Sequence, residues 1–269
     1  MKTGFLITAR LKSTRLPFKI LKDLNGKTVI DRIIDRAKEV KGISEIVICT
    51  STNPQDRALV DIAQNNTIYY FNGDEEDVLK RLLDAATFYG MGSFISITAD
   101  NPLFSIYHAN LVFENLQTRK CDFVKIEGLP LGCAVYGVGV KALKVLSKIK
   151  PIFDTEIWGY LIDRPEIFTV ETIKVNGRLN RPEFRLTLDY QEDYKLISNI
   201  YSNVIFDKCL NLDDVVNYLE NNPELTQINR NCVQLDLENR VKEEIDRVYK
   251  ENLEEIKRIR EEINLAIGK

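Results

Sequence analysis

The first hundred residues alternate short apolar runs with segments of helical periodicity. Four runs have the length and composition of strands: GFLITA, EIVICT, TIYYF and SFISITA, at residues 4–9, 45–50, 67–71 and 93–99. Between them, apolar residues three or four positions apart predict helices at residues 29–40, 56–65 and 75–89. This order is typical of βα units around a mostly parallel sheet, so the pattern predicts an α/β fold.

The remainder of the chain continues the pattern less regularly. It predicts strands at residues 122–126, 133–138, 168–175 and 183–188, and helices at residues 106–117, 140–149, 155–163, 192–204 and 212–220. Residues 235–267 are rich in charge and contain no Pro or Gly, and apolar residues recur there at roughly helical spacing. We expect one long amphipathic helix that packs against the body of the protein or against a partner subunit, in a homodimer.

The charge balance and the rarity of certain residues exclude several classes of function. The 37 Lys and Arg residues nearly balance 40 Asp and Glu residues, which leaves no basic surface for nucleic acid or an anionic membrane. The single histidine argues against a Ser-His-Asp triad and against a multi-histidine metal site. Five cysteines without a CxxC pair, no signal peptide at Met1 and no long apolar run predict a cytoplasmic protein with reduced thiols.

The segment after the first predicted strand is strongly basic. Within ten residues it carries two hydroxyls and four cations: Ser13, Thr14, Arg10, Lys12, Arg15 and Lys19. In a parallel α/β sheet this loop lies in the ligand crevice, where guanidinium groups can pair with phosphate oxygens. The segment matches neither the P-loop nor the dinucleotide motif. We therefore expect a polyphosphate site; a solvated basic loop is the alternative.

Two further segments place carboxylates at predicted strand ends. Asp100 follows the fourth strand, and Asp189 ends the strand at 183–188. A carboxylate facing a basic loop suits Mg²⁺, which needs only one or two protein carboxylates when substrate phosphates and waters complete its shell. Asp193 begins the next helix and favours its N-terminus, and Arg185 holds either phosphate or a neighbouring carboxylate. Helix capping and ordinary turn chemistry remain alternatives for both segments.

Taken together, these segments resemble a known family. Over residues 2–225 the chain is similar to the nucleotide-sugar cytidylyltransferases of the GT-A-like nucleotidyltransferase fold, especially the spore coat polysaccharide type, with CMP-KDO and CMP-neuraminate synthetases as more distant relatives. The similarity rests on ARLKSTRLPFKIL, STNPQD, NGDEEDVLKRL, ITADNPL, LPLG, RLTLDYQEDYKLI and LDDVVNYLENNPEL. It implies a three-layer α/β/α fold with a mostly parallel mixed sheet. We expect a nucleotidyltransferase domain at residues 1–225 and a helical extension at 226–269.

The resemblance also implies roles for individual residues. The triphosphate of CTP would be held by Arg10, Arg15 and Lys19, with Ser13 as a hydroxyl donor in the same loop and Ala9 and Leu11 as backbone contacts. Ser51, Asp74 and Asp77 would lie near the base and ribose, and Asp100 and Asp189 would bind Mg²⁺. The implied reaction is attack by an acceptor oxygen on the α-phosphorus of CTP, with pyrophosphate leaving. Arg10, Arg15, Lys19 and Asp100 would be its catalytic residues.

One departure from the family pattern concerns the acceptor. The spore-coat type usually continues Pro-x-Gly with Leu-Asp-Val-Glu, whereas here Gly132 is followed by Cys-Ala-Val-Tyr, without either acid. The acceptor site is therefore rebuilt or takes a different substrate. The candidates on the acceptor side are Glu127, Tyr136, Thr155 and Glu156.

The leading hypothesis is a Mg²⁺-dependent cytidylyltransferase that activates an acidic sugar or a related small acceptor for surface glycan synthesis. A second reading keeps the fold with another nucleotide or with glycosyl transfer, although the single acid of ITADNPL disfavours the DxD metal site of glycosyltransferases. A third reading is a catalytically silent nucleotide-binding subunit of an assembly.

Overall fold

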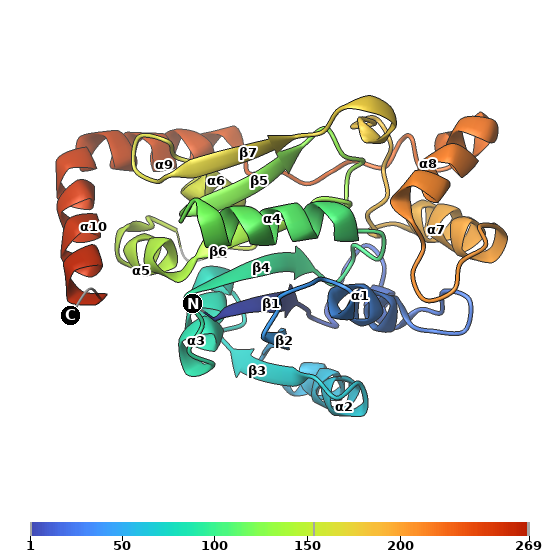
Figure 1. Ribbon diagram of the computed structural model, residues 1–269, viewed down its shortest axis with the longest axis horizontal. Coiled ribbons are helices and arrows are strands. Elements are labelled where there is room, and N and C mark those ends of the chain that lie inside the picture. The colour runs from blue at the N-terminus through green and yellow to red at the C-terminus, as the bar shows by residue number, and fades with distance from the viewer. Residues whose placement is uncertain (1, 153, 268–269) are drawn as a thin grey trace.

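A seven-stranded sheet forms the centre of the molecule (Figure 1). The computed structural model describes residues 2–152 and 154–267. The strand order is β3-β2-β1-β4-β6-β5-β7. The strands span Thr3–Thr8 (β1), Glu45–Ser51 (β2), Tyr69–Gly73 (β3), Ser93–Thr98 (β4), Phe123–Glu127 (β5), Tyr136–Gly139 (β6) and Val170–Lys174 (β7). The first four are mutually parallel, β6 runs antiparallel to β4 and β5, and β7 is parallel to β5, which confirms the mostly parallel mixed sheet.

Helices cover both faces of the sheet, because alternate residues of each strand enter different cores. On β1, Phe5 and Ile7 pack with α1 (Val29–Lys38), α2 (Ala58–Asn65) and α4 (Ile106–Thr118), whereas Leu6 packs with α3 (Val78–Phe88) and α5 (Val140–Ile149). Two more helices, α7 (Gln191–Asn203) and α8 (Leu212–Asn221), extend the first core. The predicted three-layer α/β/α architecture is thus confirmed.

Short helical segments occupy several connections. The 3-10 segments are η1 (Lys19–Leu21), η2 (Pro54–Arg57), η3 (Gly177–Leu179) and η4 (Pro223–Gln227). The predicted helix at residues 155–163 was too long, since only Gly159–Ile162 (α6) is α-helical.

The strand predicted at residues 183–188 was wrong. This segment forms only an isolated bridge, between Leu131 and Arg185, and joins no strand of the sheet that the described residues form. Its backbone instead crosses the ends of other elements: Leu131 N–H donates to Phe184 O, and Leu188 N–H donates to Asp100 O at 2.9 Å. These contacts still bring Asp189 to the end of β4.

The C-terminal region contains two helices rather than the single predicted one. They are α9 (Asn239–Glu251) and α10 (Leu253–Ile267), with a break at Asn252. Their buried residues Ile245, Tyr249, Ile256 and Ile263 join the core formed by α3 and α5. Figure 1 shows α9 along the upper edge and α10 turning down beside α5. Both helices therefore pack against the body of the same chain.

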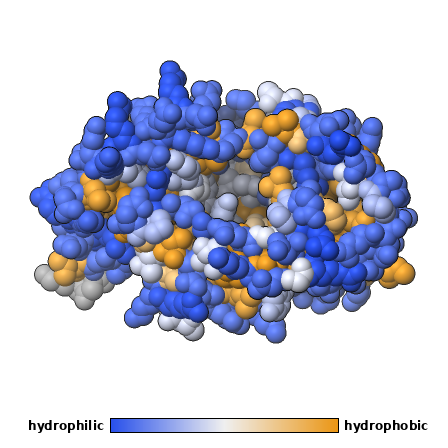
Figure 2. All heavy atoms as spheres, turned by 90° about the horizontal axis from the view of Figure 1, so that it is seen from above, coloured by the Kyte–Doolittle hydropathy of each residue, from blue (hydrophilic) through white to orange (hydrophobic). Residues whose placement is uncertain are grey.

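The surface of the molecule is mostly hydrophilic. Figure 2 shows one long face on which hydrophilic side chains predominate and apolar side chains gather in scattered groups. Within the described residues, no helix combines the length and the apolar character needed to cross a bilayer.

Candidate active site

The basic loop after β1 is anchored by a buried carboxylate. Leu11 N–H donates to Asp56 Oδ1 at 2.7 Å, and the Ser51 hydroxyl donates to the other oxygen of Asp56. Asp56 and Ser51 are both buried. Ser51, predicted near the base and ribose, thus acts in this structure on the loop through Asp56. No role for Asp56 follows from the sequence pattern, although it lies in the STNPQD motif.

The other predicted loop contacts are largely engaged within the protein. Ala9 N–H donates to Cys49 O at 3.1 Å, which continues the sheet. Ser13 Oγ accepts from Leu16 N–H at 3.4 Å. Arg10 points away from the carboxylate pair described next: Nη1 donates to Glu75 O at 3.0 Å, and Nη2 lies 3.1 Å from Glu156 Oε2.

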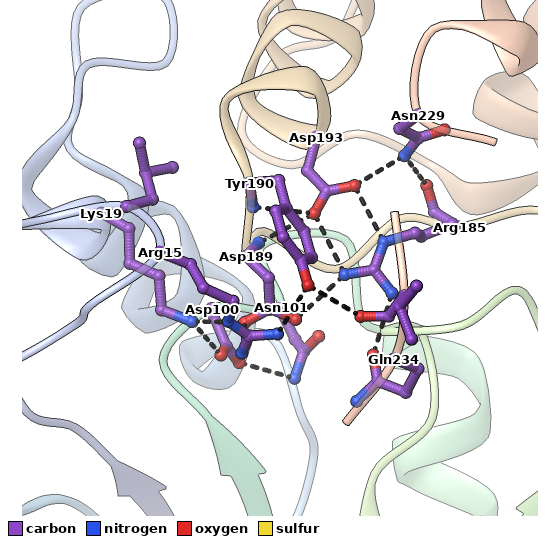
Figure 3. Close-up of polar contacts among 12 residues, drawn as sticks. Arg15, Lys19, Asp100, Asn101, Arg185, Asp189, Tyr190, Asp193, Asn229 and Gln234 are labelled. Atoms are coloured by element: carbon purple, nitrogen blue, oxygen red, sulfur yellow. Dashed lines mark hydrogen bonds and ion pairs between the residues drawn. The ribbon is translucent and has the colours of Figure 1, made fainter. Parts of the chain in front are cut away.

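Lys19 joins the two predicted metal ligands. Its Nζ lies 2.6 Å from Asp100 Oδ2 and 2.8 Å from Asp189 Oδ1, so both carboxylates contact one ammonium nitrogen (Figure 3). Burial opposes the charge of Lys19, but the two carboxylates outweigh it and raise the pKa of the ammonium. The structure therefore brings together residues separated by 170 positions in the chain.

Arg15 reaches the same cluster from the basic loop. Its Nη2 donates to Asp189 Oδ1 at 2.9 Å, and its guanidinium lies 5.0 Å from the centre of the Tyr190 ring. Burial tends to raise the pKa of Asp189, yet Lys19, Arg15 and Arg185 together lower it. Asp189 is consequently an anion at neutral pH.

A buried network holds Asp189 from behind. Arg185 Nη2 donates to Asp189 Oδ2 at 3.0 Å, while its Nε donates to Asp193 Oδ1 at 2.9 Å. Asp193 is fully buried and also accepts the backbone N–H groups of Asp189 and Tyr190, each at 3.0 Å. Of the two partners predicted for Arg185, the structure shows the carboxylate. Asp193 caps α7, as predicted, and fixes the backbone of Asp189 as well.

Two residues near the C-terminal helices complete this network. Asn229 Nδ2 donates to Arg185 O and to Asp193 Oδ1, and Arg185 Nη1 donates to Gln234 Oε1 at 2.9 Å (Figure 3). Sequence reasoning missed both residues. They lie 44 and 49 positions from Arg185, and no local motif marks them.

The segment before α3 is held by its own side chains. Asp74 Oδ1 accepts from the N–H groups of Glu76 and Asp77, and the bond from Asp77 is the main reason that the pKa of Asp74 is lowered. Asp77 caps α3 by accepting from Lys80 N–H at 3.0 Å, and it also pairs with Lys150. In this structure Asp77 therefore acts on the shape of the segment.

The acceptor-side candidates are less uniform. Tyr136 and Glu127 are exposed; the Tyr136 ring packs against Phe123 and Trp158, and Glu127 Oε1 lies 3.0 Å from Lys125 Nζ. The Glu156 side chain is 67% exposed. Thr155 is fully buried. Its hydroxyl donates to Asp77 and accepts from Leu79 N–H.

The carboxylate pair has the chemistry that a hard cation requires. Across the described residues, no group of three or more His, Cys, Asp and Glu side chains could hold a metal ion alone. Asp100 and Asp189 nevertheless already share one cation. Two carboxylates fit Mg²⁺ when substrate oxygens and waters supply the remaining ligands.

Comparison with known proteins identifies the family. The family model described as cytidylyltransferase matches residues 5–262. An uncharacterized protein of Methanocaldococcus jannaschii is 30% identical over 238 residues, covering 87% of this chain and 97% of that protein. The spore coat polysaccharide biosynthesis protein SpsF of Bacillus subtilis is 26% identical over 227 residues, covering 82% and 95%.

Solved structures share the fold. A cytidylyltransferase from Leptospira borgpetersenii superposes with a TM-score of 0.77 at 24% identity, covering 88% of this chain and all (100%) of that one. CMP:2-keto-3-deoxy-manno-octonic acid synthetase complexed with CTP gives a TM-score of 0.61 at 15% identity, covering 76% and 100%. With the family model matching nearly the whole chain, the conclusion is direct: this chain belongs to the cytidylyltransferase family and is a nucleotidyltransferase.

Proposed function

We propose that the chain transfers CMP from CTP to an acidic sugar or a related small acceptor, with release of pyrophosphate, in a Mg²⁺-dependent reaction. The observation that carries the proposal is the convergence of Arg15 and Lys19 on Asp100 and Asp189 at the carboxyl end of β4. Cations and hard oxygen ligands at one point suit a triphosphate with its metal. The CTP-bound neighbour supports the choice of nucleotide.

The protein groups would act on a simple displacement. An acceptor oxygen forms a bond to the α-phosphorus, the bond to the β-phosphate oxygen breaks, and pyrophosphate leaves with the electron pair. Arg15 and Lys19 would turn from Asp189 to the phosphate oxygens and stabilise the charge that develops there. Arg10 would leave Glu75 and Glu156 for the same purpose.

Mg²⁺ would be held by Asp100 and Asp189, and it would neutralise phosphate charge and orient the triphosphate. The residues behind the site have a separate task. Arg185 and Asp193 keep Asp189 charged and fixed in position, so that its oxygen is available once Lys19 moves.

Acceptor binding would fall to the surface around Glu127, Tyr136 and Glu156, with Thr155 supporting it through Asp77. The name of the spore coat relative supports a role in surface glycan synthesis. The free thiols of all the cysteines support a cytoplasmic location, where thiols stay reduced. A homodimer remains a prediction that sedimentation equilibrium would test.

The decisive experiment measures pyrophosphate release from each of the four common nucleoside triphosphates. The acceptor panel contains acidic sugars and phosphorylated sugars, and parallel reactions contain Mg²⁺ or an excess of EDTA. We expect release with CTP and an acidic sugar, and its loss with EDTA. Preference for another nucleotide would contradict the base assignment, and tight CTP binding without release for any acceptor would favour the catalytically silent reading.

A further inference from the structure

Arg81 is a fully buried arginine whose guanidinium is only partly satisfied. It lies on the first turns of α3, and its Nη1 donates to Asp74 O at 2.9 Å. Its Nε and Nη2 are buried and have no hydrogen-bond partner among the described residues. Since buried donors normally find acceptors, two open donors on one cation require an explanation.

Arg81 contacts the segment before α3, which the family resemblance places near the base and ribose. Its partner Asp74 belongs to the segment before α3, and Gly73 leaves room for its stem, because a Cβ there would lie 2.8 Å from Arg81 Cγ. Burial is the main cause that lowers the pKa of Arg81, and the nearby charge of Arg10 lowers it further. Arg81 therefore lies beside the carboxyl end of β3.

A second open group lies close to this end of the sheet. Thr8 pairs with Cys49 in the register of β1 and β2, and Cys49 is close enough to Arg81 to sense its charge. Thr8 Oγ1 is buried and also lacks a partner within the described part of the chain. Polar atoms without a partner are thus found on α3 and on β1, near the carboxyl ends of the parallel strands.

A second buried arginine shows that burial alone does not leave guanidinium donors without acceptors. Arg36 of α1 is 2% exposed, and its Nε, Nη1 and Nη2 all donate to the carbonyls of Phe104 and Leu210. Every guanidinium nitrogen of this arginine therefore has an acceptor. The difference indicates that the open donors of Arg81 have a partner that arrives from outside the protein.

We propose that Arg81 reads the base of the nucleotide, with Nε and Nη2 donating to O2 and N3 of cytosine. This inference rests on the proposed function. Cytosine presents two adjacent acceptors that match two parallel N–H donors, whereas uracil carries a hydrogen on N3 that would oppose a donor. A phosphate is less suitable here, because Arg15 and Lys19 already serve that role at the carboxylate pair, and Arg81 lies instead beside Gly73 and the Phe71 ring.

Arg81 is fully buried, so its open donors meet a ligand only after a neighbouring side chain moves. The charge of Arg10 helps to lower the pKa of Arg81, and Arg10 itself is bound to Glu75 O and Glu156. Release of Arg10 from Glu75 and Glu156 would open this position, and the base would then enter beside Arg81.

The test replaces Arg81 with Gln, which keeps a polar side chain but removes the charged pair of donors. We expect the ratio of kcat/KM for CTP over UTP to fall by about tenfold to a hundredfold, the effect of losing charged hydrogen bonds. The affinity for pyrophosphate should stay unchanged. Binding of cytidine, measured without any acceptor, should weaken in parallel.

Two further variants separate recognition from folding. Arg36→Gln removes an equally buried arginine and should lower the unfolding midpoint without changing the CTP:UTP ratio. Gly73→Ala keeps the guanidinium but displaces its stem, and it should reduce the ratio even if Arg81→Gln fails to fold. A folded Arg81→Gln enzyme with the wild-type ratio, or an unchanged ratio in Gly73→Ala when Arg81→Gln does not fold, overturns the proposal.

The two proposals fail in different ways. If the wild-type protein binds cytidine but transfers CMP to no acceptor, the proposed function fails while cytidine binding by Arg81→Gln still tests the base reading. If wild-type transfer from CTP is robust and the variant discriminates as before, only the role of Arg81 is rejected.

Discussion

The ionic cluster around Asp189 and the acceptor-side surface differ in how firmly their side chains are held. Asp189 contacts Lys19, Arg15 and Arg185, and Asp193 fixes its backbone from a fully buried position. On the acceptor side, Glu127 and Glu156 are exposed and each pairs with a single cation of the described chain. A cluster held by many bonds can stay constant while the neighbouring surface changes, so under the proposed function a new acceptor need not disturb the phosphate chemistry.

The largest expected effect comes from the cluster. Asp100→Asn keeps the size of the side chain but removes the charge that is proposed to bind Mg²⁺, and we expect turnover to fall by about a thousandfold, as several kcal/mol of charge stabilisation is lost. Pyrophosphate release at saturating CTP and Mg²⁺ measures it. Because the fold should survive, the far-UV circular dichroism spectrum should match the wild type. Full activity of the Asp100→Asn enzyme would remove Asp100 from the metal site.

The next effect concerns stability rather than rate. Asp193→Asn leaves the buried Arg185 without its main partner, and breaking such a buried pair costs about 3 kcal/mol. Urea unfolding followed by fluorescence should show this loss. The matched control is Asp214→Asn on α8, an exposed position where we expect a change below about 0.5 kcal/mol. Equal effects of the two substitutions would mean that the network behind Asp189 contributes no more to the free energy of unfolding than an exposed carboxylate does.

A smaller change is expected for Arg15→Ala, which removes one charged donor from the phosphate side. CTP affinity should fall by about tenfold to a hundredfold, since charged hydrogen bonds contribute about 1.5–3 kcal/mol. Cytidine affinity should not change. Isothermal titration with CTP and with cytidine separates the two results, and equal losses for both ligands would assign Arg15 to general structure.

The smallest effect belongs to the acceptor side. Glu156→Gln breaks an exposed pair with Arg10, so the free energy of unfolding should change by less than about 1 kcal/mol. We expect the KM for the acceptor to change severalfold and the KM for CTP to change less, because Arg10 keeps its bond to Glu75 O when the charge of Glu156 is removed. A change confined to the KM for CTP would place Glu156 on the nucleotide side.

Much of the fold could be predicted because its signals are local. The apolar runs at residues 4–9 and 45–50 correspond closely to β1 and β2, since buried parallel strands are continuous in hydrophobicity. The segment at 183–188 has a similar composition, but its partners are loop residues and the end of β4, and only tertiary contacts show that. The break at Asn252 was also invisible, because neither Pro nor Gly marks it and packing against α5 turns the chain there.

The candidate site was also predictable where its signals are local. Motifs at strand ends indicated Arg15, Lys19, Asp100 and Asp189, and the structure brings these residues together. Asn229 and Gln234 were not predicted. They contact Arg185 because the chain folds back after α8, and no motif spacing in the sequence indicates that. The boundary expected after residue 225 remains a prediction, and both residues lie beyond it.

The return of the chain to Arg185 after α8 has a consequence for biosynthesis. A nascent chain synthesised only as far as α8 already contains every described strand and every charged residue of the ionic cluster, yet it lacks Asn229 and Gln234. The last partners of Arg185 emerge from the ribosome after α8. The chain can therefore form its sheet before they emerge, while the network behind Asp189 is completed only once residue 234 has been synthesised.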